Sequence, residues 1–166
     1  MSTDPSRNTG LQQPGAMTIL TFRLMGEIFA LAVERVHEII DPLPVTLVPR
    51  TDPFVPGLIN VRGSVVPVAD LRQRLDMPPA EATEHSRMVV LDVLIEDTPT
   101  KVALVADSVD QVSEVDGSRI EPVPEIGMRF PPRFLAGVAK RDGELIILLR
   151  VETVFEPPQG RQPHAA

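Results

Sequence analysis

The sequence predicts a mainly β protein built from two tandem five-stranded barrels with short helices. Aromatic residues make up only 4% of the 166 residues, without Trp or Tyr, so aliphatic side chains must fill the core. Proline occurs 18 times, about twice the usual share, which favours short strands and fixed turns over long helices. The order of predicted elements also occurs twice, and each copy is expected to close into a barrel because closure removes exposed strand edges.

The first copy begins with two strands. Apolar and polar residues alternate over residues 18–24, which is typical of a half-buried strand. A turn at residues 25–27 leads into a second strand at residues 28–32. Residues 1–16, which precede them, are polar with Gly and Pro, so we expect a disordered tail there.

An amphipathic segment and an edge strand come next. Within residues 33–40, Val33, Val36 and Ile40 stand at helical spacing, which predicts one or two helical turns lying on the barrel. The prolines that follow end this segment, and residues 45–48 are expected to form a short edge strand.

A hairpin with a capped helix behind it is the clearest unit of the chain. Two apolar runs, residues 58–61 and 65–68, flank Arg62-Gly63-Ser64, where the glycine is free to take a positive φ. Asp70 then stands in the N-cap position of a short helix over residues 71–75. The hairpin would place Arg62 at its tip, in solvent or against a partner.

The second half of the chain repeats this order of elements. A proline- and acid-rich connector separates the halves, so we place subdomain 1 at about residues 17–80 and subdomain 2 at about 87–156, with strand exchange between them allowed. The expected elements are the connector at 77–86, strands at 87–95 and 101–105, an amphipathic segment at 107–115, an irregular proline-rich excursion at 119–134, a closing hairpin and helix at 137–154, and a tail at 157–166.

Two shifts of the sequence reveal the repeat. A shift of 73 residues places residues 30–36 over residues 103–109. A shift of 80 places Gly57 over Gly137 and Gly63 over Gly143, and the difference of seven residues falls within the excursion. Two such barrels side by side would bury surface that one barrel alone would leave in water.

Composition excludes several classes of function. The chain carries a net charge of −7 and few aromatic rings, which suits neither phosphate backbones nor base stacking, so we expect no nucleic-acid partner. Without cysteine it can form neither disulfides nor thiolate metal sites. The longest apolar run, residues 28–33, is far shorter than the about 20 residues that a membrane helix needs, and no signal sequence precedes it. We therefore expect a cytoplasmic protein that is not inserted in the membrane.

No residues in the sequence form a catalytic or metal-binding pattern. The three histidines, His37, His85 and His164, are isolated, whereas a metal site needs several convergent ligands. Ser64 lacks the G-x-S-x-G setting of a nucleophile, and Asp70 has no Gly-rich phosphate loop beside it. The sequence therefore predicts no enzyme activity, no metal and no cofactor. An alternative hypothesis is a small acidic enzyme of an unrecognised type, which the detection of a bound metal or nucleotide would support.

Four apolar residues occupy matching places in the two copies: Val36, Ile39, Val109 and Val112. They either seal the ends of the barrels or line a groove that receives a helix of a partner. Arg62 is either a solvated turn residue or a partner contact, and Gly57 and Gly63 can serve backbone geometry under both interpretations.

Four segments of the chain resemble the CheW coupling proteins of bacterial chemotaxis, namely EIFALAVERVHEII, VPGLINVRGSVVPVADLR, ALVADSVDQV and FLAGVAKRDGELIILL. The resemblance covers about residues 17–156. Its most specific segment, GLINVRGSVVPVADLR, is also typical of the homologous regulatory domain of the chemotaxis histidine kinase CheA. The resemblance implies a CheW-like domain of two SH3-like barrels without enzymatic activity.

The resemblance also implies partners. It implies an adaptor that couples the cytoplasmic tips of methyl-accepting chemoreceptors to the regulatory domain of CheA in membrane-associated arrays. An adaptor of a non-flagellar chemosensory pathway, such as surface motility, is the alternative. Where the family usually has an acid at the end of the second hairpin, this chain has Arg150, which puts the cap of the last helix and any partner contact there in question.

The residues that match sensitive positions of the family are Val36, Glu38, Gly57 and Arg62, and a Glu38–Arg62 pair is expected to stiffen the hairpin tip. The full set predicted for partner binding is Val36, Glu38, Ile39, Gly57, Asn60, Arg62, Gly63, Val109 and Val112.

Overall fold

The computed structural model describes residues 15–49, 52–124, 127 and 129–156. The segments predicted as tails lie outside the described residues, apart from residues 15 and 16. The strands (β), short 3₁₀ helices (η) and α-helices are, in chain order, β1 (Ala16–Leu24), β2 (Glu27–Ala32), η1 (Val33–Arg35), β3 (Val36–Ile40), β4 (Thr46–Leu47), β5 (Gly57–Val61), β6 (Ser64–Ala69), α2 (Leu71–Arg74), β7 (Arg87–Ile95), β8 (Thr98–Ala106), β9 (Ser108–Asp116), η2 (Gly117–Arg119), η3 (Pro132–Phe134), β10 (Leu135–Arg141), β11 (Glu144–Leu149) and α3 (Val151–Val154).

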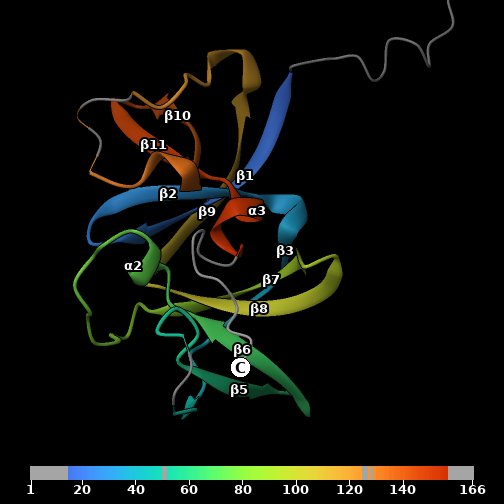
Figure 1. Ribbon diagram of the computed structural model, residues 1–166. Helices are drawn as coiled ribbons and strands as arrows, with labels where there is room; N and C mark the ends of the chain where they lie inside the picture. The colour runs from blue at the N-terminus through green and yellow to red at the C-terminus, as the bar shows by residue number, and fades with distance from the viewer. Residues whose placement is uncertain (1–14, 50–51, 125–126, 128, 157–166) are drawn as a thin grey trace, which may run out of the picture.

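The strands form two sheets, and each sheet takes strands from both halves of the chain (Figure 1). Barrel 1 is the six-stranded sheet with the order β3-β7-β8-β6-β5-β4, and barrel 2 is the five-stranded sheet with the order β10-β11-β2-β1-β9. The first two strands of each repeat therefore pair with the hairpin of the other repeat. This confirms the mainly β fold of two SH3-like barrels.

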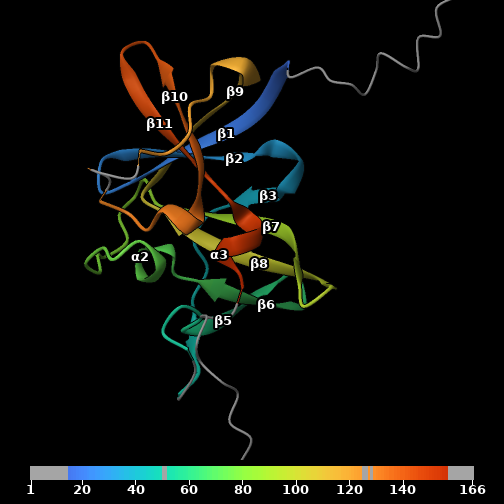
Figure 2. The ribbon, with the colours of Figure 1, turned by 45° about the horizontal axis from the view of Figure 1, so that its top comes forward.

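Two short parallel pairings make the exchange between the repeats. In barrel 2, residues 146–148 of β11 run parallel to residues 28–30 of β2. In barrel 1, Val68 and Ala69 of β6 run parallel to Ala103 and Leu104 of β8. Seen from two directions, the sheets lie one above the other, with α2 and α3 beside the space between them (Figure 2).

The segment predicted as one or two helical turns is mostly strand, so that prediction was wrong beyond its first turn. Val33–Arg35 forms η1, but Val36–Ile40 forms β3 and pairs antiparallel with β7. A spacing of four residues, as between Val36 and Ile40, fits one face of a helix and one side of a strand equally well. β-Branched residues then favour the strand. The second amphipathic segment, predicted at 107–115, is likewise the strand β9, paired with β1.

The hairpin turns follow the predicted glycine chemistry. Arg62 and Gly63 have φ angles of 51° and 89°, between the paired residues Val61 and Ser64. Positive φ at both central residues defines a type I′ turn, whose twist matches that of the strands it joins. Asp142 and Gly143 repeat this turn in the second copy, with φ angles of 51° and 82°.

The two short α-helices are capped differently. Asp70 is the N-cap of α2, as predicted, because its Oδ1 accepts a hydrogen bond from Arg72 N at 3.1 Å. Arg150 occupies the same place before α3 and provides no side-chain cap. The other end of α3 is held by Arg74 of α2, whose Nε donates to Val154 O at 2.9 Å.

Ion pairs tie each helix to the segment where the chain crosses from one barrel to the other. Arg72 of α2 is buried and pairs with Asp107, just before β9. Glu152 of α3 pairs with Arg35 in η1, just before β3. In the first copy the helix carries the positive partner of the ion pair, and in the second copy it carries the negative one. In both copies the ion pair joins the helix to the crossing segment.

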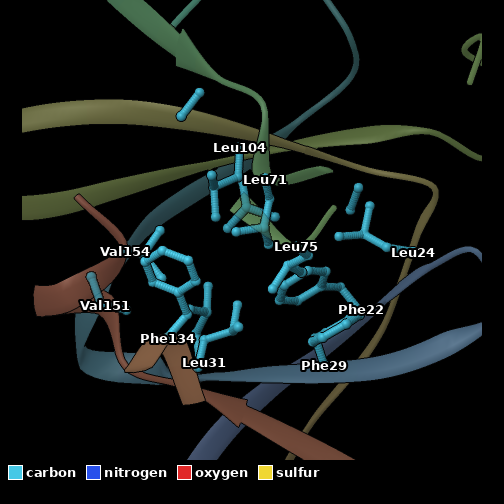
Figure 3. Packing of buried hydrophobic residues seen from close by; sticks show 14 of the residues in the cluster. Phe22, Leu24, Phe29, Leu31, Leu71, Leu75, Leu104, Phe134, Val151 and Val154 are labelled. Carbon is cyan, nitrogen blue, oxygen red and sulfur yellow. The ribbon is translucent and has the colours of Figure 1, made fainter. Parts of the chain in front are cut away.

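The largest group of buried residues lies between the barrels and is called the shared core (Figure 3). Among the described residues, it contains 25 buried residues from both sheets and both α-helices, whereas the interiors of barrel 1 and barrel 2 hold seven and six. All six phenylalanines of the chain belong to it. Most of the stabilising burial is therefore shared by the two barrels.

We predict opposite effects from changing the two N-cap positions. Asp70→Ala should lower the free energy of unfolding by about 0.5–2 kcal/mol, because α2 loses its cap. Arg150→Asp should raise it by up to about 1 kcal/mol. The backbone there already has φ −97° and ψ 93°, close to the −100° and 96° of Asp70. Urea denaturation measures both changes, and a loss of stability in Arg150→Asp would contradict this account of α3.

Candidate partner-binding site

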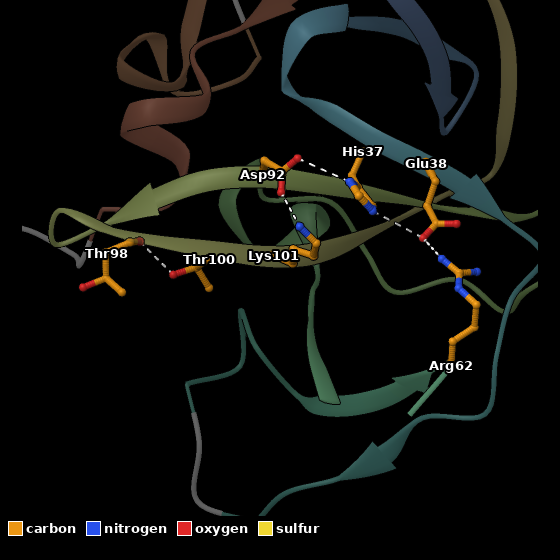
Figure 4. A network of polar contacts seen from close by, with 7 residues as sticks. All are labelled: His37, Glu38, Arg62, Asp92, Thr98, Thr100 and Lys101. Atoms are coloured by element: carbon orange, nitrogen blue, oxygen red, sulfur yellow. Dashed lines mark hydrogen bonds and ion pairs between the residues drawn. The ribbon is translucent and has the colours of Figure 1, made fainter. Parts of the chain in front are cut away.

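An ion pair joins the tip of the β5–β6 hairpin to β3 (Figure 4). Arg62 Nη2 contacts Glu38 Oε2, which confirms the expected pairing. The side chain of Arg62 is 68% exposed, so the pair adds only about 0–1 kcal/mol to folding. Its main effect is to orient the guanidinium group at the surface.

This ion pair is one end of a polar network over β3, β7 and β8 (Figure 4). His37 Nε2 lies 3.8 Å from Glu38 Oε2, and His37 Nδ1 lies 3.5 Å from Asp92 Oδ2. Asp92 also accepts a hydrogen bond from Lys101 Nζ at 2.8 Å. That hydrogen bond, with the positive charge of Lys101, holds the pKa of Asp92 below its ordinary value. Asp92 is therefore a carboxylate at neutral pH.

Two further predicted site residues hold the hairpin tip in shape. Asn60 Oδ1 accepts a hydrogen bond from Gly63 N at 2.7 Å. Gly63 has a φ of 89°, which a residue with a Cβ rarely adopts. Asn60 and Gly63 thus fix the turn that carries Arg62.

Gly57 is required for space rather than for its backbone conformation. A Cβ added there would overlap the carbonyl oxygen of Thr46 and lie 2.7 Å from Val45 Cγ1. The edge segment containing β4, which pairs antiparallel with β5, therefore lies in direct contact with the glycine. Gly137 repeats this arrangement in barrel 2, where an added Cβ would lie 2.6 Å from Ile120 Cγ2 and 2.9 Å from Glu121 O.

The four matching apolar residues divide into two kinds. Val36 and Val109 are half-buried and pack against the shared core. Ile39 and Val112 are 41% and 57% exposed. The first pair therefore packs against the core between the barrels, and the second pair is more exposed to solvent.

Val65 and Leu145 are among the exposed apolar residues that were not predicted as site residues. They correspond to one another in the repeat. The buried residues Val66 and Ile146 follow them in the chain. Because successive side chains of a strand point to opposite faces, this alternation is the sequence signal that predicts the exposure of Val65 and Leu145. Ile39 and Val65 of barrel 1 thus have exposed counterparts in barrel 2, at Val112 and Leu145.

The predicted residues are divided between the two barrels. Val36, Glu38, Ile39, Gly57 and Asn60 belong to the strands of barrel 1, and Arg62 and Gly63 to its hairpin turn, whereas Val109 and Val112 lie on β9 of barrel 2. An apolar groove of about 410 Å³ adjoins the hairpin of barrel 1, lined by Leu43, Pro44, Thr46, Leu58, Ile59, Asn60 and Val65.

Among the described residues, no group of three or more His, Asp or Glu side chains is arranged to hold a metal ion. In the same part of the chain, no helix is both long enough and apolar enough to cross a membrane.

Comparison with known proteins identifies the family. A model of the CheW-like domain matches residues 18–159. The chain belongs to the CheW family. The chemotaxis protein CheW of Rhizobium meliloti is 32% identical over 148 residues, which cover 89% of this chain and 92% of that protein. The chemotaxis protein CheW of Bacillus subtilis is 29% identical over 138 residues, covering 83% and 86% of the two chains.

A solved structure of the CheW family supports the fold as well. The scaffolding protein TtCheW from Thermoanaerobacter tengcongensis aligns with a TM-score of 0.77 and 30% sequence identity. The alignment covers 92% of this chain and 95% of the TtCheW chain. The two chains therefore share the same fold over nearly their whole length.

We predict that Gly57→Ala and Gly137→Ala each lower the free energy of unfolding by about 1–3 kcal/mol. The reason is that the added Cβ meets a backbone oxygen, which cannot rotate away. Gly63→Asn is the comparison variant, because nothing lies within 4 Å of its added Cβ and its φ of 89° alone strains the substitution. Asparagine tolerates a left-handed φ better than other residues with a Cβ, so the cost should be about 1 kcal/mol. Urea denaturation compares the variants. If Gly57→Ala were as stable as the wild type, β4 would be able to shift away from the added Cβ, and the prediction would be wrong.

Proposed function

We propose that this CheW-family chain is a non-catalytic adaptor that couples methyl-accepting chemoreceptors to the histidine kinase CheA in signalling arrays. The observation that carries the proposal is the match to the CheW-like domain over residues 18–159, nearly the whole described chain. The proposed location is the cytoplasm, beside the membrane that holds the receptors. The proposed partners are the cytoplasmic tip of a receptor and the regulatory domain of CheA.

The arrangement of exposed residues supports a bridging role. A protein that joins two partners needs two docking faces in a fixed relation. Ile39 and Val65 are exposed aliphatic residues of barrel 1, and Val112 and Leu145 are exposed at the equivalent positions of barrel 2. The shared core holds the two barrels together, so a partner bound to one face has a defined position relative to the other.

Barrel 1 carries the more specific of the two faces. Exposed aliphatic residues supply area to bury, whereas a charged group fixes orientation and rejects wrong partners. Arg62, held by Glu38, stands at the hairpin tip, and the apolar groove lies along the same hairpin. We assign Arg62 and this groove to one partner contact, with Glu38 as the residue that positions Arg62.

Arg62→Glu tests this assignment. We expect the variant to keep its stability within about 1 kcal/mol, because the ion pair is exposed. We expect at least about tenfold weaker binding to one partner, either the receptor cytoplasmic fragment or the CheA regulatory domain. The reason is that the variant presents a negative charge to a partner surface that is matched to the positive charge of Arg62. Urea denaturation and titration calorimetry with each partner measure the two effects.

Arg129→Glu is the matched control for this experiment. Arg129 is 65% exposed and also makes one ion pair, with Glu27, so the variant changes charge by the same amount away from the hairpin. Its binding to both partners should equal that of the wild type. If Arg62→Glu also bound both partners with wild-type affinity, the assignment of Arg62 to the partner contact would be wrong.

A further inference from the structure

His37 and Arg62 approach the same carboxylate oxygen (Figure 4). Arg62 Nη2 contacts Glu38 Oε2, and His37 Nε2 lies 3.8 Å from that oxygen. The other imidazole nitrogen, Nδ1, lies 3.5 Å from Asp92 Oδ2. The imidazole is partly exposed, so protons from solvent reach it.

Charged groups face His37 from several elements. Glu38 lies on its own strand, Asp92 on β7, Lys101 on β8 and Arg62 on the β5–β6 turn. Arg35 of η1 lines a pocket together with Asp92 and Lys101, but its ion pair is with Glu152 of α3.

The charges in this network balance only while the imidazole is neutral. Two carboxylates, Glu38 and Asp92, then face two permanent cations, Arg62 and Lys101. A protonated imidazole adds a third cation beside the same two carboxylates. The cations must then share the carboxylate oxygens, and Glu38 Oε2 is the oxygen that His37 and Arg62 have in common.

We propose that protonation of His37 loosens the Arg62–Glu38 ion pair and so makes the partner contact at Arg62 sensitive to pH. This rests on the proposed function of Arg62. Histidine is the side chain that ordinarily changes charge between about pH 5 and pH 8, while arginine and lysine stay charged. At low pH the wild-type chain should behave like Glu38→Gln, with Arg62 present but no longer oriented.

The first arm of the test uses the free protein and needs no partner. The ¹⁵N NMR signal of Arg62 Nε–Hε is followed between about pH 7.5 and about pH 5.5, the range in which histidine titrates. We expect it to shift in the wild type and to stay constant in His37→Gln. The signal of Arg23, which donates to Asp110 at 3.1 Å on barrel 2, should not respond in either protein. An equal response of Arg62 in both proteins would overturn the proposal.

The second arm measures the affinity for the partner that Arg62→Glu fails to bind, at the same two pH values. The affinity of the wild type should fall by about two- to fivefold more than that of His37→Gln, a range that an exposed ion pair can supply. His37→Gln reports any titration of the partner itself. In Glu38→Gln the additional loss should disappear, because the shared carboxylate is gone.

The two arms separate the proposal from the function on which it rests. If the Arg62 signal responds through His37 but the affinity does not, the ion pair is pH-sensitive and the proposed partner contact at Arg62 is wrong. If the signal does not respond through His37, the switch is wrong whatever the affinity does.

Discussion

The core shared by the two barrels is the constraint on which the rest of this structure depends. In the part of the chain that the structure describes, each barrel encloses six or seven buried residues of its own, whereas 25, including every phenylalanine, lie between the barrels. Each sheet also needs strands from both halves of the chain. Neither barrel can therefore close alone, and the faces carrying Arg62 and Val112 stand in one fixed relation. That fixed relation is what the proposed bridging role requires.

Much of the fold could be predicted from local signals. The type I′ turn at Arg62-Gly63, the Asp70 cap and the repeated order of elements follow from turn chemistry, capping preference and alternation. β3 was missed because its four-residue spacing fits both helix and strand. The short parallel pairings that exchange strands have no local signature, because they join residues more than 30 positions apart.

The candidate site was only partly predictable, for the same reason. The Glu38–Arg62 pair was expected from the family resemblance and is present. The approach of His37 to Asp92 depends on the pairing of β3 with β7, which no local pattern shows. Gly57 was predicted as a partner-binding residue that can also serve backbone geometry. The structure adds that Gly57 leaves room for the neighbouring residues Val45 and Thr46, which only the tertiary contact reveals. Sequence reasoning therefore finds turns and caps more readily than contacts between distant strands.

The most direct test of the shared core is to divide the chain in the connector, between residues 81 and 82, and to purify both fragments. The structure predicts that neither fragment alone unfolds cooperatively in urea, since each lacks strands of both barrels. Mixed together, the fragments should associate and recover one cooperative transition with the far-UV circular dichroism spectrum of the intact protein. A cooperative transition in either fragment alone would contradict the account, because it would show a barrel that folds without the shared core.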